Sequence, residues 1–101
     1  MEIKIIKDDK QTTVQIFGRV DTLTATDLES QLTPILDEDL HRLIVDCEHL
    51  EYISSAGFRL MVMVHKAMVA KSGQLILTHL NTNVYSLFAM TGLSKVMNIE
   101  E

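Results

Sequence analysis

The pattern of hydrophobic and polar positions at the start of the 101-residue chain is that of a β-hairpin. Residues 1–7 place three isoleucines among charged residues, and residues 12–17 alternate apolar and polar side chains. Both patterns are typical of strands, and the charged residues between them indicate a turn. Gly18 comes next and is expected to end the second strand.

The spacing changes to that of a helix in residues 22–36, where apolar side chains recur every three or four positions. We predict Thr24 as the N-cap of this helix, because threonine is a favoured capping residue. Pro34 lacks a backbone N–H group, so the helix should kink or stop near Thr33.

The remaining two thirds of the chain alternate between apolar runs and helical spacing. Residues 42–47 (R-L-I-V-D-C) are apolar nearly throughout, which is typical of a strand covered on both faces. Further strands are predicted at residues 74–79 and 95–99, and further helices at residues 56–72 and from Asn81 or Thr82 to Met90, with Gly73 and Gly92 after them. The order β-β-α-β-α-β-α-β predicts one α/β domain over residues 1–101, a mixed sheet with helices packed on it.

Composition narrows the choice of function. The chain has 14 Asp and Glu against 9 Lys and Arg, a net charge of −5, which argues against a nucleic-acid partner because such binding rests on clustered basic residues. No signal peptide or membrane span is evident. The single cysteine, Cys47, favours a reducing compartment, and we expect a cytoplasmic protein.

The segment Ser54-Ser55-Ala56-Gly57 lies where a loop after a buried strand runs into a helix. One interpretation is that Ser54 or Ser55 caps the helix, since a serine oxygen accepts a hydrogen bond from the free N–H groups of the first turn. The other is that the hydroxyl carries a phosphoryl group, which would face those N–H groups and the positive end of the helix dipole.

Three segments of the chain together resemble one protein family. They are G-R-V-D at residues 18–21, L-I-V-D-C-E-H-L-E-Y-I-S-S-A-G-F-R-L at residues 43–60 and V-x-x-L-F-x-M-x-G-L at residues 84–93. The middle segment is quite specific, and the three occur in the family's order over nearly the whole chain. The chain thus resembles a STAS domain of the bacterial anti-sigma-factor antagonists.

The resemblance implies partner switching. The unmodified protein would bind an anti-sigma factor that is a serine kinase, and so release the sigma factor. The kinase would then phosphorylate the serine, which separates the complex. A phosphatase would restore the unmodified protein. The family's serine corresponds to Ser55, with Ser54 as the alternative, because Ser54 stands where the family commonly has Asp. The chain also ends soon after its last predicted strand, whereas many relatives continue into another helix, and we expect a monomer or weak dimer.

The resemblance also points to a docking surface. Asp21 matches an acidic position that lies close to the phosphorylated serine in the family, although it is equally well explained as a turn or helix-entry residue. Small or polar neighbours could line the same surface, and the following helix has an unusually narrow polar side. The partner-binding residues expected from these considerations are Asp21, Thr22, Thr24, Ser54, Ala56, Gly57, Phe58, Val62 and Met63, but the last three are equally compatible with the core.

Other chemistry is poorly represented. The four histidines, His41, His49, His65 and His79, show no metal-ligand spacing. Cys47 lies within an apolar strand, and neither a phosphate-binding loop nor G-x-S-x-G occurs, so we expect no enzyme, metal or cofactor. The alternatives are a STAS scaffold subunit of a transport complex, a small serine hydrolase and a ligand-sensing module.

Overall fold

The computed structural model describes residues 1–100 and confirms a mixed α/β domain. Its strands are β1 (Glu2–Lys7), β2 (Thr12–Val20), β3 (Arg42–Asp46), β4 (Leu50–Ile53), β5 (Gln74–Thr78) and β6 (Asn98–Glu100). Its helices are α1 (Thr22–Leu36), α2 (Ser55–Ala70) and α3 (Thr82–Met90), followed by a 3-10 turn at Leu93–Lys95.

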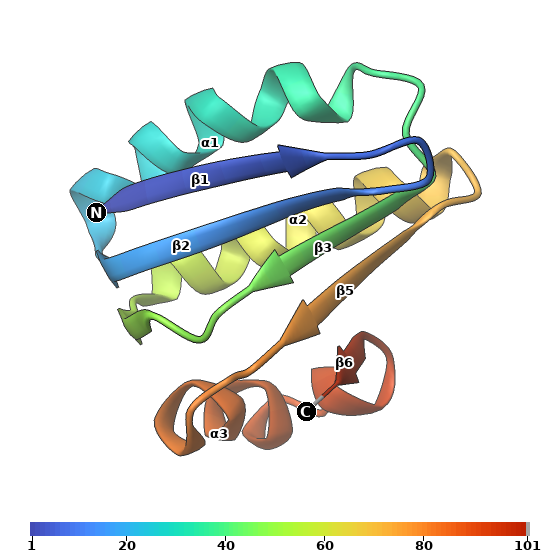
Figure 1. Cartoon of the computed structure of the whole chain (residues 1–101). Coiled ribbons are helices and arrows are strands. Elements are labelled where there is room, and N and C mark those ends of the chain that lie inside the picture. The colour runs from blue at the N-terminus through green and yellow to red at the C-terminus, as the bar shows by residue number, and fades with distance from the viewer. Residues whose placement is uncertain (101) are drawn as a thin grey trace.

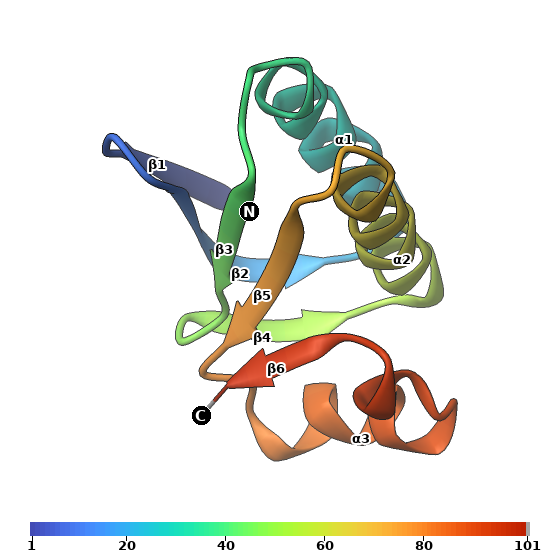
Figure 2. The same cartoon turned by 90° about the vertical axis from the view of Figure 1, so that its right-hand side faces the viewer.

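The strands follow the path β1-β2-β3-β5-β6, and β4 pairs with the far end of β2. β1 is antiparallel to β2, as the predicted hairpin requires, and every other pairing is parallel. Helices α1 and α2 lie side by side on one face of the sheet, and α3 lies at one end, beyond β4 and β6 (Figures 1 and 2). The core between the sheet and helices α1 and α2 is mostly aliphatic. It includes Val14, Ile16, Leu28, Leu32, Leu43, Val45, Val64 and Met68.

Strand β2 bends at Gly18 and does not end there as expected. Its first part pairs with β3, whereas Gly18 and the residues after it pair with β4, and the register shifts at this point. Gly18 has φ +92°, a backbone conformation that glycine adopts readily. The bend therefore redirects β2 towards β4, a strand that the sequence pattern had suggested was a loop.

Three further expectations need correction. Helix α1 does not stop near Thr33 but runs to Leu36, because Pro34 lies in the last turn and removes only one hydrogen bond there. Strand β3 is covered on one face only, with Leu43 and Val45 buried and their neighbours half-exposed. Strand β6 occupies Asn98–Glu100 and not residues 95–99, since the 3-10 turn takes up the start of that segment.

None of the helices in residues 1–100 has the length and apolar character needed to cross a lipid bilayer.

Candidate functional site

The carboxyl ends of β2 and β4 lie side by side, and a helix starts from each. The amide of Ser54 donates a hydrogen bond to the carbonyl of Val20 at 2.7 Å, which joins the two strand ends. Helix α1 begins two residues after Val20, and α2 begins at Ser55. We call the surface formed by Asp21, Thr22, Ser54 and Ser55 the helix-start face. The positive ends of two helix dipoles meet there.

Asp21 is the N-cap of α1. Its carboxylate accepts hydrogen bonds from the amides of Leu23 at 3.0 Å and Thr24 at 2.9 Å, and its own amide donates to the Thr24 hydroxyl at 2.8 Å. This is a capping box, so the expectation that Thr24 itself is the N-cap was wrong. The hydrogen bond from the Thr24 amide, followed by that from the Thr24 hydroxyl, lowers the pKa of Asp21 below its ordinary 3.8.

The two adjacent serines differ in their surroundings. Ser54 is half-buried and is the N-cap of α2, with its hydroxyl oxygen accepting the amide of Gly57 at 3.3 Å. Ser55 is exposed and is the first residue of the helix. The capping role thus belongs to Ser54, and the Ser55 side chain stands at the surface beside the free N–H groups of the first turn.

Gly57 sets how closely α2 approaches the two strand ends. A Cβ atom at this position would lie 2.7 Å from side-chain atoms of both Val20 and Ile53. Gly57 is buried, so among the expected partner-binding residues it has a packing position beneath the helix-start face. Because Gly57 has no side chain, the first turn of α2 can pack directly against the ends of β2 and β4, which places Ser54 and Ser55 there.

The other expected contact residues lie on two sides of α2. On the side of α1, Thr22, Ala56 and exposed Met63 line a shallow depression of about 280 Å³. On the other side the Phe58 ring lies 4.9 Å from the ring of Phe88 in α3, and Phe58 is half-buried. Val62 is also half-buried. These residues do not form one continuous strip, since Ser55 stands between two differently lined surfaces.

Comparison with known proteins identifies the family. A STAS domain model matches residues 1–101. The chain belongs to the STAS domain family. The anti-sigma-B factor antagonist of Staphylococcus aureus is 29% identical over 101 residues, which are 100% of this chain and 94% of the relative. The resemblance read from the three sequence segments is therefore confirmed.

Solved structures agree on the fold of this STAS domain. The anti-sigma factor antagonist SpoIIAA in its unphosphorylated form matches with a TM-score of 0.84 at 18% identity, over 99% of this chain and 89% of that one. The Bacillus cell fate determinant SpoIIAA in its phosphorylated form matches with a TM-score of 0.79 at 17% identity, over 99% and 92%. The same fold thus occurs in a modified and an unmodified protein.

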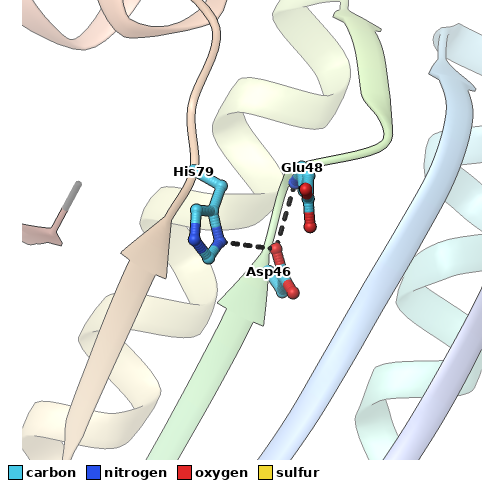
Figure 3. Close-up of side chains that lie close together, drawn as sticks. All are labelled: Asp46, Glu48 and His79. Carbon is cyan, nitrogen blue, oxygen red and sulfur yellow. Dashed lines mark hydrogen bonds and ion pairs between the residues drawn. The ribbon is translucent and has the colours of Figure 1, made fainter.

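The STAS fold also gathers a group of side chains that the sequence did not reveal. Asp46, Glu48 and His79 offer ligand atoms within 4.8 Å of one another, although Asp46 and His79 are 33 positions apart (Figure 3). The parallel pairing of β3 and β5 sets Asp46 opposite Thr78, which brings His79 beside it. Only this register, and no sequence spacing, could have indicated the group.

Hydrogen bonds within this group tie the ends of β3 and β5 together. The Asp46 Oδ1 atom accepts the amide of Glu48 at 3.1 Å and lies 3.0 Å from Nδ1 of His79. Partial burial acts to raise the pKa of Asp46, but the hydrogen bonds from Glu48, His79 and Gln15 outweigh it and lower the pKa. We therefore interpret the group as a structural clasp.

Cys47 has no nucleophilic character in this domain. Burial, with a smaller contribution from the charge of Asp46, raises the pKa of its thiol to about 12. A thiol with that pKa is protonated at neutral pH, and only the thiolate reacts readily.

Proposed function

We propose that this STAS domain is an anti-sigma-factor antagonist and that phosphorylation of Ser55 reverses its binding to an anti-sigma factor. The observation that carries the proposal is the position of Ser55, an exposed hydroxyl on the first residue of α2, next to a separate serine that caps the helix. The unmodified domain binds the anti-sigma factor, and the sigma factor is released.

The relatives support this assignment. The Staphylococcus aureus protein is named an anti-sigma-B factor antagonist and aligns with the whole chain. SpoIIAA has been solved in unphosphorylated and phosphorylated forms, and both share this fold. A domain of this architecture therefore carries the modification without losing its fold.

The chemistry of the site suits a reversible phosphoryl switch. We propose that the anti-sigma factor is itself a serine kinase. It transfers the γ-phosphoryl group of ATP to Ser55 Oγ, breaking the bond to ADP while the hydroxyl proton passes to a base of the kinase. A phosphatase returns the hydroxyl by hydrolysis. The domain supplies the acceptor and catalyses neither step.

The added charge acts on the partner more than on the domain. Phosphoserine carries about −1.5 to −2 charges at neutral pH, and the N–H groups at the start of α2 favour an anion there. Opposing like charges across an interface cost several kcal/mol, and each ~1.4 kcal/mol is tenfold in affinity. The phosphate on Ser55 therefore leaves the domain folded but weakens its binding to the anti-sigma factor.

The direct test combines phosphorylation with binding. The domain is incubated with its cognate anti-sigma kinase and ATP, and phosphopeptide mapping should place the modification on Ser55. Ser55→Asp should weaken binding to the kinase about tenfold or more, because one charge mimics part of the phosphate. Ser55→Ala should bind normally but resist ATP-dependent release.

Two results would contradict the proposal. One is modification at Ser54 or elsewhere by an active cognate kinase. The other is unchanged affinity of Ser55→Asp, which would show that charge at this position does not control binding. Ser72→Asp is a suitable matched control, because Ser72 is exposed just beyond the opposite end of α2 and the change adds the same charge away from the helix-start face.

A further inference from the structure

A groove opens on the side of Ser55 that faces α3. It has a volume of about 420 Å³ and is enclosed by β4, the first turn of α2 and one side of α3, which lies beyond β4 in Figure 2. Its walls include the apolar side chains of Ile53, Phe58, Val84 and Leu87. Ser55 belongs to the same wall, so the groove and the phosphoryl acceptor share one surface. We call it the α3 groove.

The α3 groove is held open by contacts outside its mouth. The side chain of Asn81, the N-cap of α3, donates hydrogen bonds to the carbonyls of Leu50 at 3.2 Å and Glu51 at 3.4 Å, which fixes the start of α3 to β4. The guanidinium of Arg19 lies 4.4 Å from the centre of the ring of Tyr52, a residue that also lines the groove. The contacts of Asn81 therefore fix α3 relative to β4, and the groove between them exists without a ligand, as is usual for binding pockets.

We infer that the α3 groove receives an apolar side chain of the anti-sigma factor as an anchor, and that phosphorylation of Ser55 expels it. The inference rests on the proposed function and names the contact through which that function works. A kinase that places ATP against Ser55 must cover the mouth of the groove, because Ser55 forms its wall. An aliphatic or aromatic side chain matches the apolar lining.

Charge at the rim restricts the partner further. Glu51 is exposed on the edge of the groove, and the whole chain carries a net charge of −5. A partner segment in which a basic residue flanks the apolar anchor fits this rim, whereas an acidic flank would be repelled. Interface anchors of this kind, buried in a pocket and surrounded by polar contacts, usually carry much of the binding energy.

The groove also explains how a phosphate so near the interface prevents binding. A phosphate on Ser55 requires water, and an apolar side chain seated beside it would remove that water without offering hydrogen bonds. Glu51 adds a second negative charge on the same rim. The modified wall therefore excludes the anchor even where no acidic group of the partner faces the phosphate.

The test blocks the mouth of the groove without touching Ser55 or the core. Asn83 is exposed on α3 and lines the groove, so Asn83→Trp fills its mouth. Ala89 is exposed on the same helix but is not among the residues that line the groove, so Ala89→Trp is the matched control. Titration calorimetry with the purified cognate anti-sigma kinase should show affinity about tenfold or more weaker for Asn83→Trp. Ala89→Trp should stay within about twofold of wild type.

A second variant guards against misfolding as the cause. Leu87→Gln makes the half-buried wall polar without adding bulk, and it should weaken binding in the same direction while circular dichroism stays native. Wild-type affinity in both folded groove variants, with Ser55→Asp still impaired, would overturn the anchor and leave the proposed function intact. Failure of the wild-type domain to bind the anti-sigma kinase would instead overturn the function on which the anchor rests.

Discussion

At the scale of single residues, two neighbouring serines of the helix-start face have different roles. Ser54 uses its oxygen to accept the amide of Gly57, whereas the next residue, Ser55, presents its hydroxyl at the surface. Sequence reasoning left both serines open for the modification, because either oxygen could have capped the helix. One position along the chain separates the hydroxyl that caps the helix from the hydroxyl that we propose accepts the phosphoryl group.

This difference predicts that the free energy of unfolding depends on Ser54 more than on Ser55. Ser54→Ala should lower the free energy of unfolding by about 1 kcal/mol, because the amide of Gly57 loses its capping partner. Ser55→Ala should change it by less than about 0.5 kcal/mol, as is usual for an exposed side chain. Urea unfolding followed by circular dichroism measures both values, and Ser54→Asp, which keeps a capping oxygen, should restore stability. Equal losses for the two alanine variants would contradict the assignment of the cap.

Asp21 gives a prediction for acid stability. Its pKa is lower in the folded domain than its ordinary 3.8, so the folded state binds this proton more weakly than the unfolded chain. The resulting stabilisation is complete above the unfolded pKa and is lost as the pH falls through the folded pKa. Stability measured from pH 6 down to pH 3 should therefore fall less steeply for Asp21→Asn, which keeps a capping oxygen but does not titrate. Parallel curves for the two proteins would show that Asp21 does not contribute.

Residue roles were predictable from sequence only where they depended on close neighbours. A serine cap before α2 was predicted because the capping residue and the helix are adjacent. Thr24 was assigned as the cap from the preference of threonine for that position, but it is the third residue of α1, and its role in the capping box depends on Asp21 three positions earlier. The clasp between Asp46 and His79 could not be predicted, since it depends on the register of β3 and β5.

At the scale of elements, the site depends on two short features of the strands. Gly18 bends β2, and β4 pairs with the bent part, so that two helices start at one edge. The sequence L-E-Y-I of β4 gave no strand signal, because its two middle residues are exposed and it is only four residues long. Its strand conformation comes from a partner about thirty residues away, which local periodicity does not report.

Gly57 tests the closeness of this packing. Gly57→Ala adds a Cβ atom 2.7 Å from side-chain atoms of Val20 and Ile53, both β-branched and buried. The resulting overpacking should outweigh the gain in helix propensity of about 1 kcal/mol and destabilise the domain by about 1 to 2 kcal/mol net. Urea unfolding measures the loss, with Ser55→Ala as the control in the same turn. A Gly57→Ala variant more stable than wild type would show that α2 can move away from the strands freely.

At the scale of the whole molecule, the proposed phosphorylation site lies outside the core. Most buried aliphatic side chains lie between one sheet face and helices α1 and α2, whereas Ser55 is exposed at the end where these helices begin, and the α3 groove reaches the core only at Ile53 and Val84. The separation explains why the α/β class, and most of the helices and strands, followed from hydrophobic spacing. It also explains why the groove did not, because it is formed by three elements distant in sequence.

This separation predicts that phosphorylation changes binding far more than folding. The phosphate makes the net charge more negative, from −5 to about −7, and the dipole of α2 offsets part of the added repulsion. The free energy of unfolding of the phosphorylated domain should therefore stay within about 1 kcal/mol of the unmodified one. Affinity for the anti-sigma kinase should fall about a hundredfold, which corresponds to ~2.7 kcal/mol.

Salt separates the two physical causes of this loss. Simple repulsion between exposed charges is screened at high ionic strength, where the Debye length falls from about 10 Å at 0.1 M to about 3 Å at 1 M salt. Dehydration of the phosphate by an apolar anchor is not relieved in this way, because the water must still be removed. We therefore expect the phosphorylated domain to keep most of its roughly hundredfold loss of affinity in about 0.5 M salt, as measured by calorimetry beside the unmodified domain. Recovery of most of the lost affinity at that salt concentration would assign the switch to long-range repulsion and remove the need for an anchor in the α3 groove.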